Sequence, residues 1–132
     1  MIHVDSSVML DMLGHDPVWE TWSVGAFRGA TARDQVVISD IVYAELAPGF
    51  ASVADLDAAL ALLGVEVATP PRSALFLAGQ VHRQYRRRRG PKTGVLPDFL
   101  VGAHALVARA TLLTRDIKRI KTYFPTVTLI AP

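Results

Sequence analysis

The chain has 132 residues, of which 51% are hydrophobic and 20% charged, and its net charge is +2. This length and composition fit one domain with a full hydrophobic core and argue against disorder. The chain contains no cysteine, which excludes disulfides, thiolate zinc sites and cysteine nucleophiles. Because it has neither a run of 18 apolar residues nor a basic and apolar N-terminal signal, we expect a soluble cytoplasmic protein without a membrane partner.

Short apolar runs alternate with helical patterns along the chain. The runs that read as buried strands are 1–5, 35–39, 65–68, 111–114 and 127–130. The helical patterns start at 6 with Ser6 or Ser7 as the cap, at Pro17 with Asp16 as the cap, at 40, at 53, at 73, at Asp98 and at about Asp116. Strands that alternate with helices predict an α/β fold with a mostly parallel sheet, although the pattern does not give the strand order.

The charges are divided unevenly between the two parts of the chain. Residues 83–121 hold 11 of the 14 Lys and Arg but only two of the 12 acids, which gives a local net charge of +9. Residues 1–82 carry a net charge of −7. Such asymmetry indicates a polyanionic partner for the C-terminal part, whereas the arginine run 86–89 taken alone is as readily explained as a solvated helix face.

Four acids follow predicted strands or begin predicted helices. Asp5 ends the first strand, and Asp116 lies two residues beyond the strand 111–114. Asp98 is placed at a helix N-terminus, and Glu45 lies about one turn into the helix that follows the second strand. Ligands of open α/β sheets bind at the carboxyl ends of the strands, so these acids are expected to converge on one edge.

Each acid also has a structural interpretation. Asp98 and Asp116 are equally suited to be helix N-caps. Asp40 reads as the cap of the helix that carries Glu45, and it is the main rival of Glu45 for the site. Asp5 is the hardest to explain in this way, because it ends an apolar run. The remaining acids read as caps or as residues of exposed faces: Asp11, Asp16, Glu20, Asp34, Asp55, Asp57 and Glu66.

A cluster of carboxylates repels itself unless a cation is present. Mg²⁺ and Mn²⁺ prefer ligand sets of carboxylates and water, and such an ion can activate water and stabilise a phosphoryl group under attack. Together with the basic surroundings, the acids predict a metal-dependent nuclease.

Four segments carry a resemblance to a known family. They are HVDSSVMLDML with Asp5, ISDIVYAEL with Glu45, LPDFLVGAHAL with Asp98, and ATLLTRDIKRIKTYFPTVTLIAP with Asp116. These segments resemble the four acidic motifs of PIN-domain ribonucleases. Their order and spacing are similar to those of the VapC toxins of bacterial toxin–antitoxin pairs. The resemblance covers essentially the whole chain, which implies a single PIN domain over residues 1–132.

The resemblance implies a three-layer α/β/α sandwich around a central, mostly parallel five-stranded sheet. It further implies a Mg²⁺- or Mn²⁺-dependent endoribonuclease, a homodimer, and a cognate VapB-type antitoxin that inserts a segment into the acidic site. Asp5 and Asp98 would bind the metal directly, and Glu45 and Asp116 either directly or through water. Two residues match positions at which the family often has a hydroxyl beside the site, Ser6 and Thr114.

One segment departs from the family pattern. Gly102, Ala103 and His104 are found where small apolar residues are usual, which leaves open whether His104 contributes to the site. The expected contacts to RNA phosphates are Arg86, Arg87, Arg88, Arg89, Lys92, Arg115, Lys118 and Arg119. Three alternatives are a PIN-like RNA-processing nuclease outside toxin–antitoxin systems, a catalytically inactive RNA- or protein-binding module, and a flavodoxin-like signalling domain with an acidic Mg²⁺ pocket.

Overall fold

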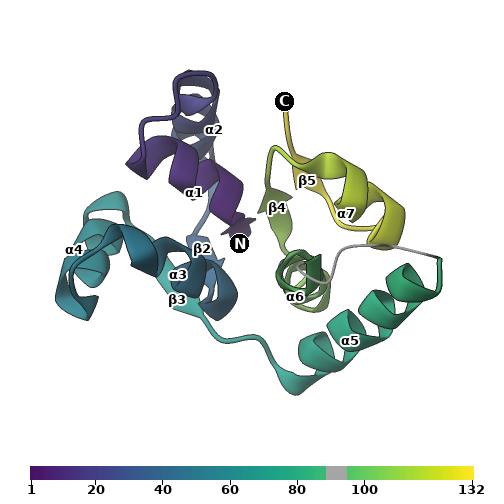
Figure 1. Ribbon diagram of the computed structural model, residues 1–132. Coiled ribbons are helices and arrows are strands. Elements are labelled where there is room, and N and C mark those ends of the chain that lie inside the picture. Colours follow the sequence, from purple (N-terminus) through teal and green to yellow (C-terminus); the bar gives the residue numbers. More distant parts are fainter. Residues whose placement is uncertain (89–94) are drawn as a thin grey trace.

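The computed structural model describes residues 1–88 and 95–132 (Figure 1). The strands are β1 (Ile2–Val4), β2 (Val36–Ser39), β3 (Val65–Ala68), β4 (Thr111–Leu113) and β5 (Leu129–Ile130). The helices are α1 (Ser6–Leu13), α2 (Glu20–Arg33), α3 (Asp40–Leu46), the 3₁₀ turn η1 (Ala47–Gly49), α4 (Val53–Leu63), α5 (Arg72–Arg87), α6 (Leu96–Val107) and α7 (Ile117–Tyr123). The predicted alternation of strands and helices is confirmed.

The five strands form one sheet in the order β3-β2-β1-β4-β5, and all neighbouring strands are parallel. The central strands β1 and β2 are buried throughout, as expected where helices cover both faces of a parallel sheet. Along the chain, the strands first proceed outward from β1 to β3 and then return to the other side of β1 with β4. The point at which this order reverses therefore lies between β1 and β4.

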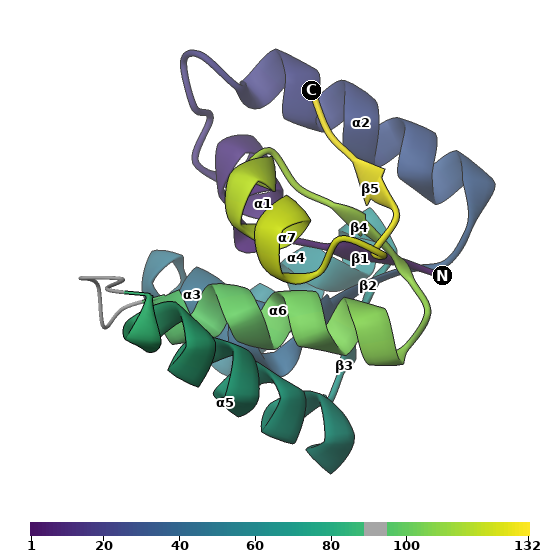
Figure 2. The same ribbon diagram turned by 90° about the vertical axis from the view of Figure 1, so that its right-hand side faces the viewer.

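Helices cover both faces of the sheet, so the expected three-layer α/β/α sandwich is confirmed (Figures 1 and 2). Figure 1, in which the strands are seen nearly end-on, shows α1, α2 and α4 on one side and α5, α6 and α7 on the other. Helix α3 packs against both α1 and α6. Helix α5 lies outside α6, farther from the sheet (Figure 2).

The start of α2 and the cap of α3 differ from the prediction. Helix α2 begins at Glu20 rather than at Pro17, and Asp16 instead accepts hydrogen bonds from the backbone N–H groups of residues 18 and 19 in the preceding turn. Helix α3 is capped by Ser39, whose hydroxyl accepts from the N–H of residue 41. Asp40 is therefore the first residue of that helix and not its cap.

No single helix within residues 1–88 and 95–132 is both long enough and apolar enough to cross a membrane. The segments Asp40–Gly49 and Val53–Leu63 reach that length and hydropathy only when they are taken together, and they are bent by 114° relative to each other.

Gly102 allows α6 and the C-terminal end of α7 to approach closely. A Cβ atom at this position would lie 2.6 Å from two ring carbons of Phe124 and 3.1 Å from a side-chain carbon of Ile120. Phe124 and Ile120 are both buried. The missing Cβ of Gly102 therefore permits the close packing of α6 against Phe124 and Ile120.

We expect Gly102→Ala to destabilise the protein, because the added methyl group overpacks the contact with Phe124. Overpacking lowers the free energy of unfolding by about 1–3 kcal/mol. The better helix propensity of alanine offsets up to about 1 kcal/mol of this loss. Gly79→Ala on α5 is the matched control, because its Cβ meets no atom within 4 Å and only the gain in propensity remains. Urea unfolding of the two variants checks this, and equal stabilities would contradict it.

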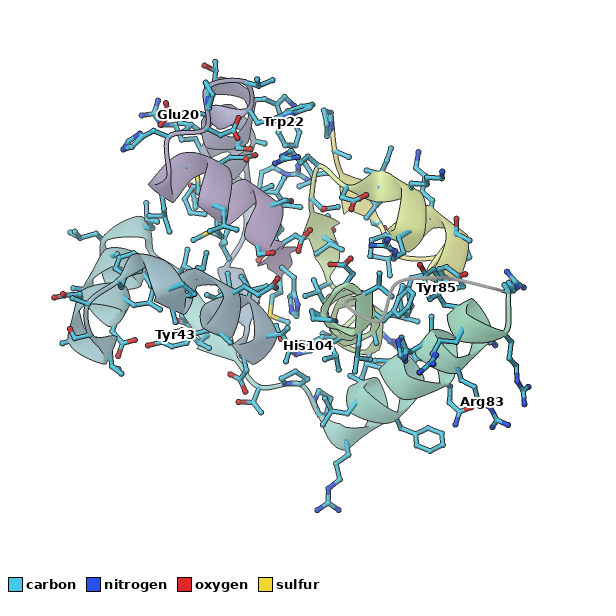
Figure 3. All side chains as sticks on the ribbon, in the orientation of Figure 1. Glu20, Trp22, Tyr43, Arg83, Tyr85 and His104 are labelled. Carbon is cyan, nitrogen blue, oxygen red and sulfur yellow. The ribbon has the colours of Figure 1, made fainter. Side chains whose placement is uncertain are left out.

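Two buried histidines face each other between β1 and α6. His3 and His104 are 1% and 4% exposed, and their rings meet edge to face with centroids 4.6 Å apart. Figure 3 labels His104 on α6. Among the described residues, neither ring nitrogen of His3 has a hydrogen-bond partner. Burial, and secondly the neighbouring His104, lower the pKa of His3 from 6.5 to about 4.

The pair predicts a loss of stability in acid. An unfolded His3 binds a proton below pH 6.5, whereas the folded one does so only near pH 4, so the unfolded state binds more protons as the pH falls through this window. The shift corresponds to roughly 3 kcal/mol at pH 4. In urea unfolding, the free energy of unfolding should fall between pH 7 and pH 4.5 for both proteins. We expect the fall to be roughly 2 kcal/mol smaller for His3→Leu than for the wild type.

A variant of an exposed histidine provides the control for this experiment. His15 lies on the surface with φ of 52°, a conformation that asparagine tolerates. His15→Asn should keep the acid loss of the wild type. Parallel stability curves for the wild type and His3→Leu would show that the buried pair does not cause the loss.

Candidate active site

The sequence-predicted acids gather at the point where the strand order reverses. Asp5 directly follows β1, and Asp116 is three residues beyond the end of β4. The register pairs Val4 with Leu113, so the two strands end side by side. In open α/β sheets, ligands bind outside the carboxyl ends of the strands at this reversal point.

Asp5 is largely buried and held by three donors. Its carboxylate accepts from the backbone N–H of Ser6 at 2.8 Å, from the hydroxyl of Thr114 at 2.8 Å and from the hydroxyl of Ser7 at 3.2 Å. Asp5 is thereby the N-cap of α1, so the prediction that Ser6 or Ser7 caps this helix was wrong. These bonds fix the orientation of the Asp5 carboxylate.

Thr114 connects the ends of β1 and β4. Its hydroxyl donates to Asp5, and the same oxygen accepts from the backbone N–H of Asp116 at 3.1 Å. Thr114 is fully buried. It therefore sets the position of the turn that carries Asp116 relative to Asp5, which is the place that was expected for a supporting hydroxyl.

Asp98 comes from the first turn of α6. That helix begins at Leu96, and its N-cap position is occupied by Val95, so the interpretation of Asp98 as the N-cap was wrong. The carboxylate forms an ion pair with the guanidinium of Arg119 on α7. Burial, and secondly the Asp5 charge, raise the pKa of Asp98 above its usual range, while Arg119 opposes this shift.

Glu45 lies on α3 at the exposed border of the cluster. Burial is the main cause that raises the pKa of its carboxyl. The charge of Asp5 and, to a smaller extent, that of Asp98 raise it further. The side chain of Ser6 opposes these effects. Glu45 is thus near enough for the charges of Asp5 and Asp98 to act on it, although it does not line the cavity. Ser6, the second predicted hydroxyl, lies between Asp5 and Glu45.

Asp116 precedes α7 at its N-cap position. Within the described residues its side chain makes no capping hydrogen bond, so the alternative of a helix cap is not supported. Burial raises the pKa of Asp5, and the charge of Asp116 contributes to the same rise. Asp116 is therefore close enough for its charge to influence Asp5.

Three of the acids line one narrow cavity of about 10 Å³, which is room for roughly one water-sized sphere. The cavity is lined by Asp5, Asp98, Val101, Asp116, Arg119 and Ile120. Within residues 1–88 and 95–132, no three His or acidic side chains are already arranged to hold a metal ion. The donor set nevertheless consists of carboxylate oxygens, and burial together with the charges of neighbouring acids raises the pKa of Asp5 and Asp98. Such a set fits Mg²⁺ or Mn²⁺.

The family model of the PIN domain matches residues 2–124. The chain belongs to the PIN domain family. No curated protein matches it with significance.

Several solved structures share the fold of this PIN domain. VapBC2 from Rickettsia felis bound to a DNA fragment from their promoter is 22% identical, with a TM-score of 0.69 and with 100% of this chain and 99% of that chain covered. VapBC-1 from nontypeable Haemophilus influenzae is 21% identical, with a TM-score of 0.72 and coverages of 99% and 98%. FitAcB from Neisseria gonorrhoeae is 20% identical, with a TM-score of 0.67 and coverages of 98% and 96%.

The two residues whose contribution was open lie elsewhere in the PIN domain. Asp40 lines a different pocket of about 560 Å³, together with Tyr43 and Asp57. His104 packs against His3 beneath the sheet. The structure thus brings together Asp5, Asp98 and Asp116, adds Glu45 at the border, and separates Asp40 and His104 from the cavity.

The predicted phosphate contacts fall into two groups. Arg86, Arg87 and Arg88 are exposed at the C-terminal end of α5, and Lys118 and Arg119 are on α7 beside the acids. Arg89 and Lys92 lie outside the described residues. Arg115 bonds to Asp11 through two nitrogens, at 2.9 and 3.1 Å, and is partly exposed.

Asp11 was expected on an exposed face or as a cap, and this was wrong. Its side chain is 2% exposed, and it accepts from Ser23 at 2.7 Å in addition to Arg115. Arg115 also lies over the ring of Trp19, with 5.3 Å to the centroid. Asp11 therefore anchors the turn between Thr114 and Asp116. The apolar residues on both sides of Asp11 in the sequence were the available signal.

We expect Asp5→Asn and Asp11→Asn to have opposite effects on stability. Without metal at pH 7.5, Asp5→Asn removes a charge that its neighbours disfavour, and the asparagine oxygen still accepts, so stability should stay the same or rise by up to about 1 kcal/mol. Asp11→Asn leaves Arg115 without its anionic partner and should cost about 2–4 kcal/mol. Urea unfolding in EDTA checks both, and similar losses would contradict the difference.

Proposed function

We propose that this PIN domain is the toxin of a toxin–antitoxin pair and acts in the cytoplasm as a metal-dependent endoribonuclease. The observation that carries the proposal is the cavity at the strand reversal, where Asp5, Asp98 and Asp116 come together from three separate segments. Membership of the PIN family and the likeness in fold to VapBC and FitAB structures support it.

The acidic side chains would hold Mg²⁺ or Mn²⁺. Asp5 and Asp98 are the direct ligands in this proposal, with Glu45 and Asp116 binding directly or through water. The ion would supply positive charge that offsets the charge developing on the phosphoryl oxygens and would lower the pKa of attacking water. Because Asp98 is paired with Arg119 through one carboxylate oxygen, a metal ion held by Asp98 would compete with this guanidinium.

The remaining side chains orient the carboxylates and bind RNA. Thr114 and Ser7 hold the carboxylate of Asp5 from two sides, which fixes one ligand before substrate arrives. Arg119, once released from Asp98, is placed beside the cavity where a phosphate of the substrate would lie. Lys118 and the exposed arginines of α5 would contact neighbouring phosphates and make RNA binding sensitive to salt.

Two further partners belong to the proposal. A toxin–antitoxin complex from Klebsiella pneumoniae and the VapBC structures share this fold. We infer a cognate VapB-type antitoxin that inhibits this chain by inserting a segment at the acidic cavity. We also infer a homodimer.

The proposal predicts discrete RNA cleavage in Mg²⁺ or Mn²⁺ and none in EDTA. Antitoxin-free protein is incubated with total RNA, and the products are mapped by their ends. Asp98→Asn and Asp116→Asn should lower the cleavage rate by about 100-fold or more, because each removes a charge from the metal site.

Asp55→Asn provides the control, because it removes an exposed carboxylate from the first turn of α4, outside the site. It should cleave like the wild type. Cleavage that persists in EDTA, or that is unchanged in both site variants, would overturn the proposal.

A further inference from the structure

A second and larger pocket opens beside the acidic cavity. Its volume is about 340 Å³, within the range of small-molecule sites, and it is lined by Tyr85, Asp116, Lys118, Arg119, Thr122 and Tyr123. Asp116 and Arg119 line both the pocket and the acidic cavity. A ligand in the pocket would therefore lie directly next to the carboxylates.

Two tyrosines from different helices form the aromatic part of the pocket. Tyr85 comes from α5 and Tyr123 from α7, and their rings meet edge to face at 6.1 Å (Figure 3 labels Tyr85 between these helices). Both rings also pack edge to face on the buried ring of Phe99, at 5.5 and 5.2 Å. Phe99 thereby holds both rings in place, and the two tyrosines are only half-buried.

The guanidinium of Arg119 lies over the Tyr85 ring, with 5.9 Å to the centroid. The Tyr85 ring and this guanidinium thus border the same pocket. The same guanidinium is paired with Asp98. Arg119 thus lies at the border of the two cavities, in contact with an aromatic face on one side and with a carboxylate on the other.

The charges of the pocket are arranged for an anion with an aromatic group. Lys118 is exposed, and within the described residues no anionic side chain lies within ion-pair distance of it. Asp116, on the wall shared with the acidic cavity, repels a phosphate from that wall. A bound phosphate is therefore directed toward Lys118, which lines only the larger pocket, while an aromatic base reaches the tyrosines.

We propose that this pocket binds one nucleotide of single-stranded RNA, with its base against Tyr85 and Tyr123 and its phosphate at Lys118. The inference rests on the proposed function and adds a subsite to it. Stacking on aromatic side chains is typical of proteins that bind unpaired bases, and it tolerates any base because every base has a π-face. The subsite would hold the chain next to the phosphate that is cleaved.

The test measures the binding of a fluorescein-labelled six-nucleotide RNA to the full chain by anisotropy in EDTA, with a gel to show that the RNA stays intact. Tyr85→Ala and Tyr123→Ala should each weaken binding about 5- to 100-fold, since one base–aromatic stack contributes about 1–3 kcal/mol. Tyr85→Phe and Tyr123→Phe keep the rings and should bind within about threefold of the wild type. Phe76→Ala removes an exposed aromatic from the same helix as Tyr85 and should not change binding.

A second pair of variants does not depend on the packing of the tyrosines. Lys118→Met should reduce the slope of log affinity against log salt by about 0.7, the value for one lost phosphate contact on a single strand. Lys121→Met removes an equal charge from α7 outside the pocket and should leave the slope unchanged.

The outcomes separate this inference from the function on which it rests. If the wild type cleaves RNA with metal but the folded Tyr→Ala variants bind like Phe76→Ala, or Lys118→Met behaves like Lys121→Met, the subsite is overturned and the nuclease remains. If the wild type neither binds nor cleaves RNA, the proposed function is overturned, and the subsite with it.

Discussion

The mutual repulsion of the carboxylates is the constraint on which the rest of this structure depends. Burial and the charges of neighbouring acids raise the pKa of Asp5, Asp98 and Glu45, so bringing the carboxylates together costs free energy in the absence of a cation. The fold offsets this cost locally. Three donors hold Asp5, and the guanidinium of Arg119 neutralises Asp98.

Two successive side chains hold the turn after β4 in place, which offsets the repulsion between the carboxylates. Thr114 bonds to Asp5, whereas Arg115, the next residue, bonds to the buried Asp11 on the opposite side. Asp116 follows directly and has its backbone N–H bound by Thr114. Two successive side chains thus attach the turn to α1 and to the end of β1, and this double attachment keeps Asp116 at the cavity against the repulsion of Asp5.

Local patterns in the sequence predicted the strands, the parallel sheet and the acids that follow the strands. The three layers were implied by the resemblance to the PIN family. The local patterns did not predict the strand order, which depends on how the helices pack. The caps were partly wrong, because Asp5 and Ser39 are both good caps and local sequence does not rank them against their neighbours. Asp11 and Arg119 were missed as partners because each pairs with a residue far away in sequence, at separations of 104 and 21 residues.

At α7, the basic residues of the C-terminal part of the chain lie beside the acidic cavity. A polyanionic substrate is repelled by an acidic cavity, and the basic residues that could compensate must therefore lie beside it and not within it. Asp116, Lys118 and Arg119 satisfy this condition within four residues: the acid precedes the helix, and the two cations are on its first turn. Arg119 fulfils it most directly, because one guanidinium neutralises Asp98 before the substrate arrives and lies at the border of the adjoining pocket. The same side chain that stabilises the acidic cluster in the absence of a cation is thus in position to receive a phosphate once Asp98 has another partner.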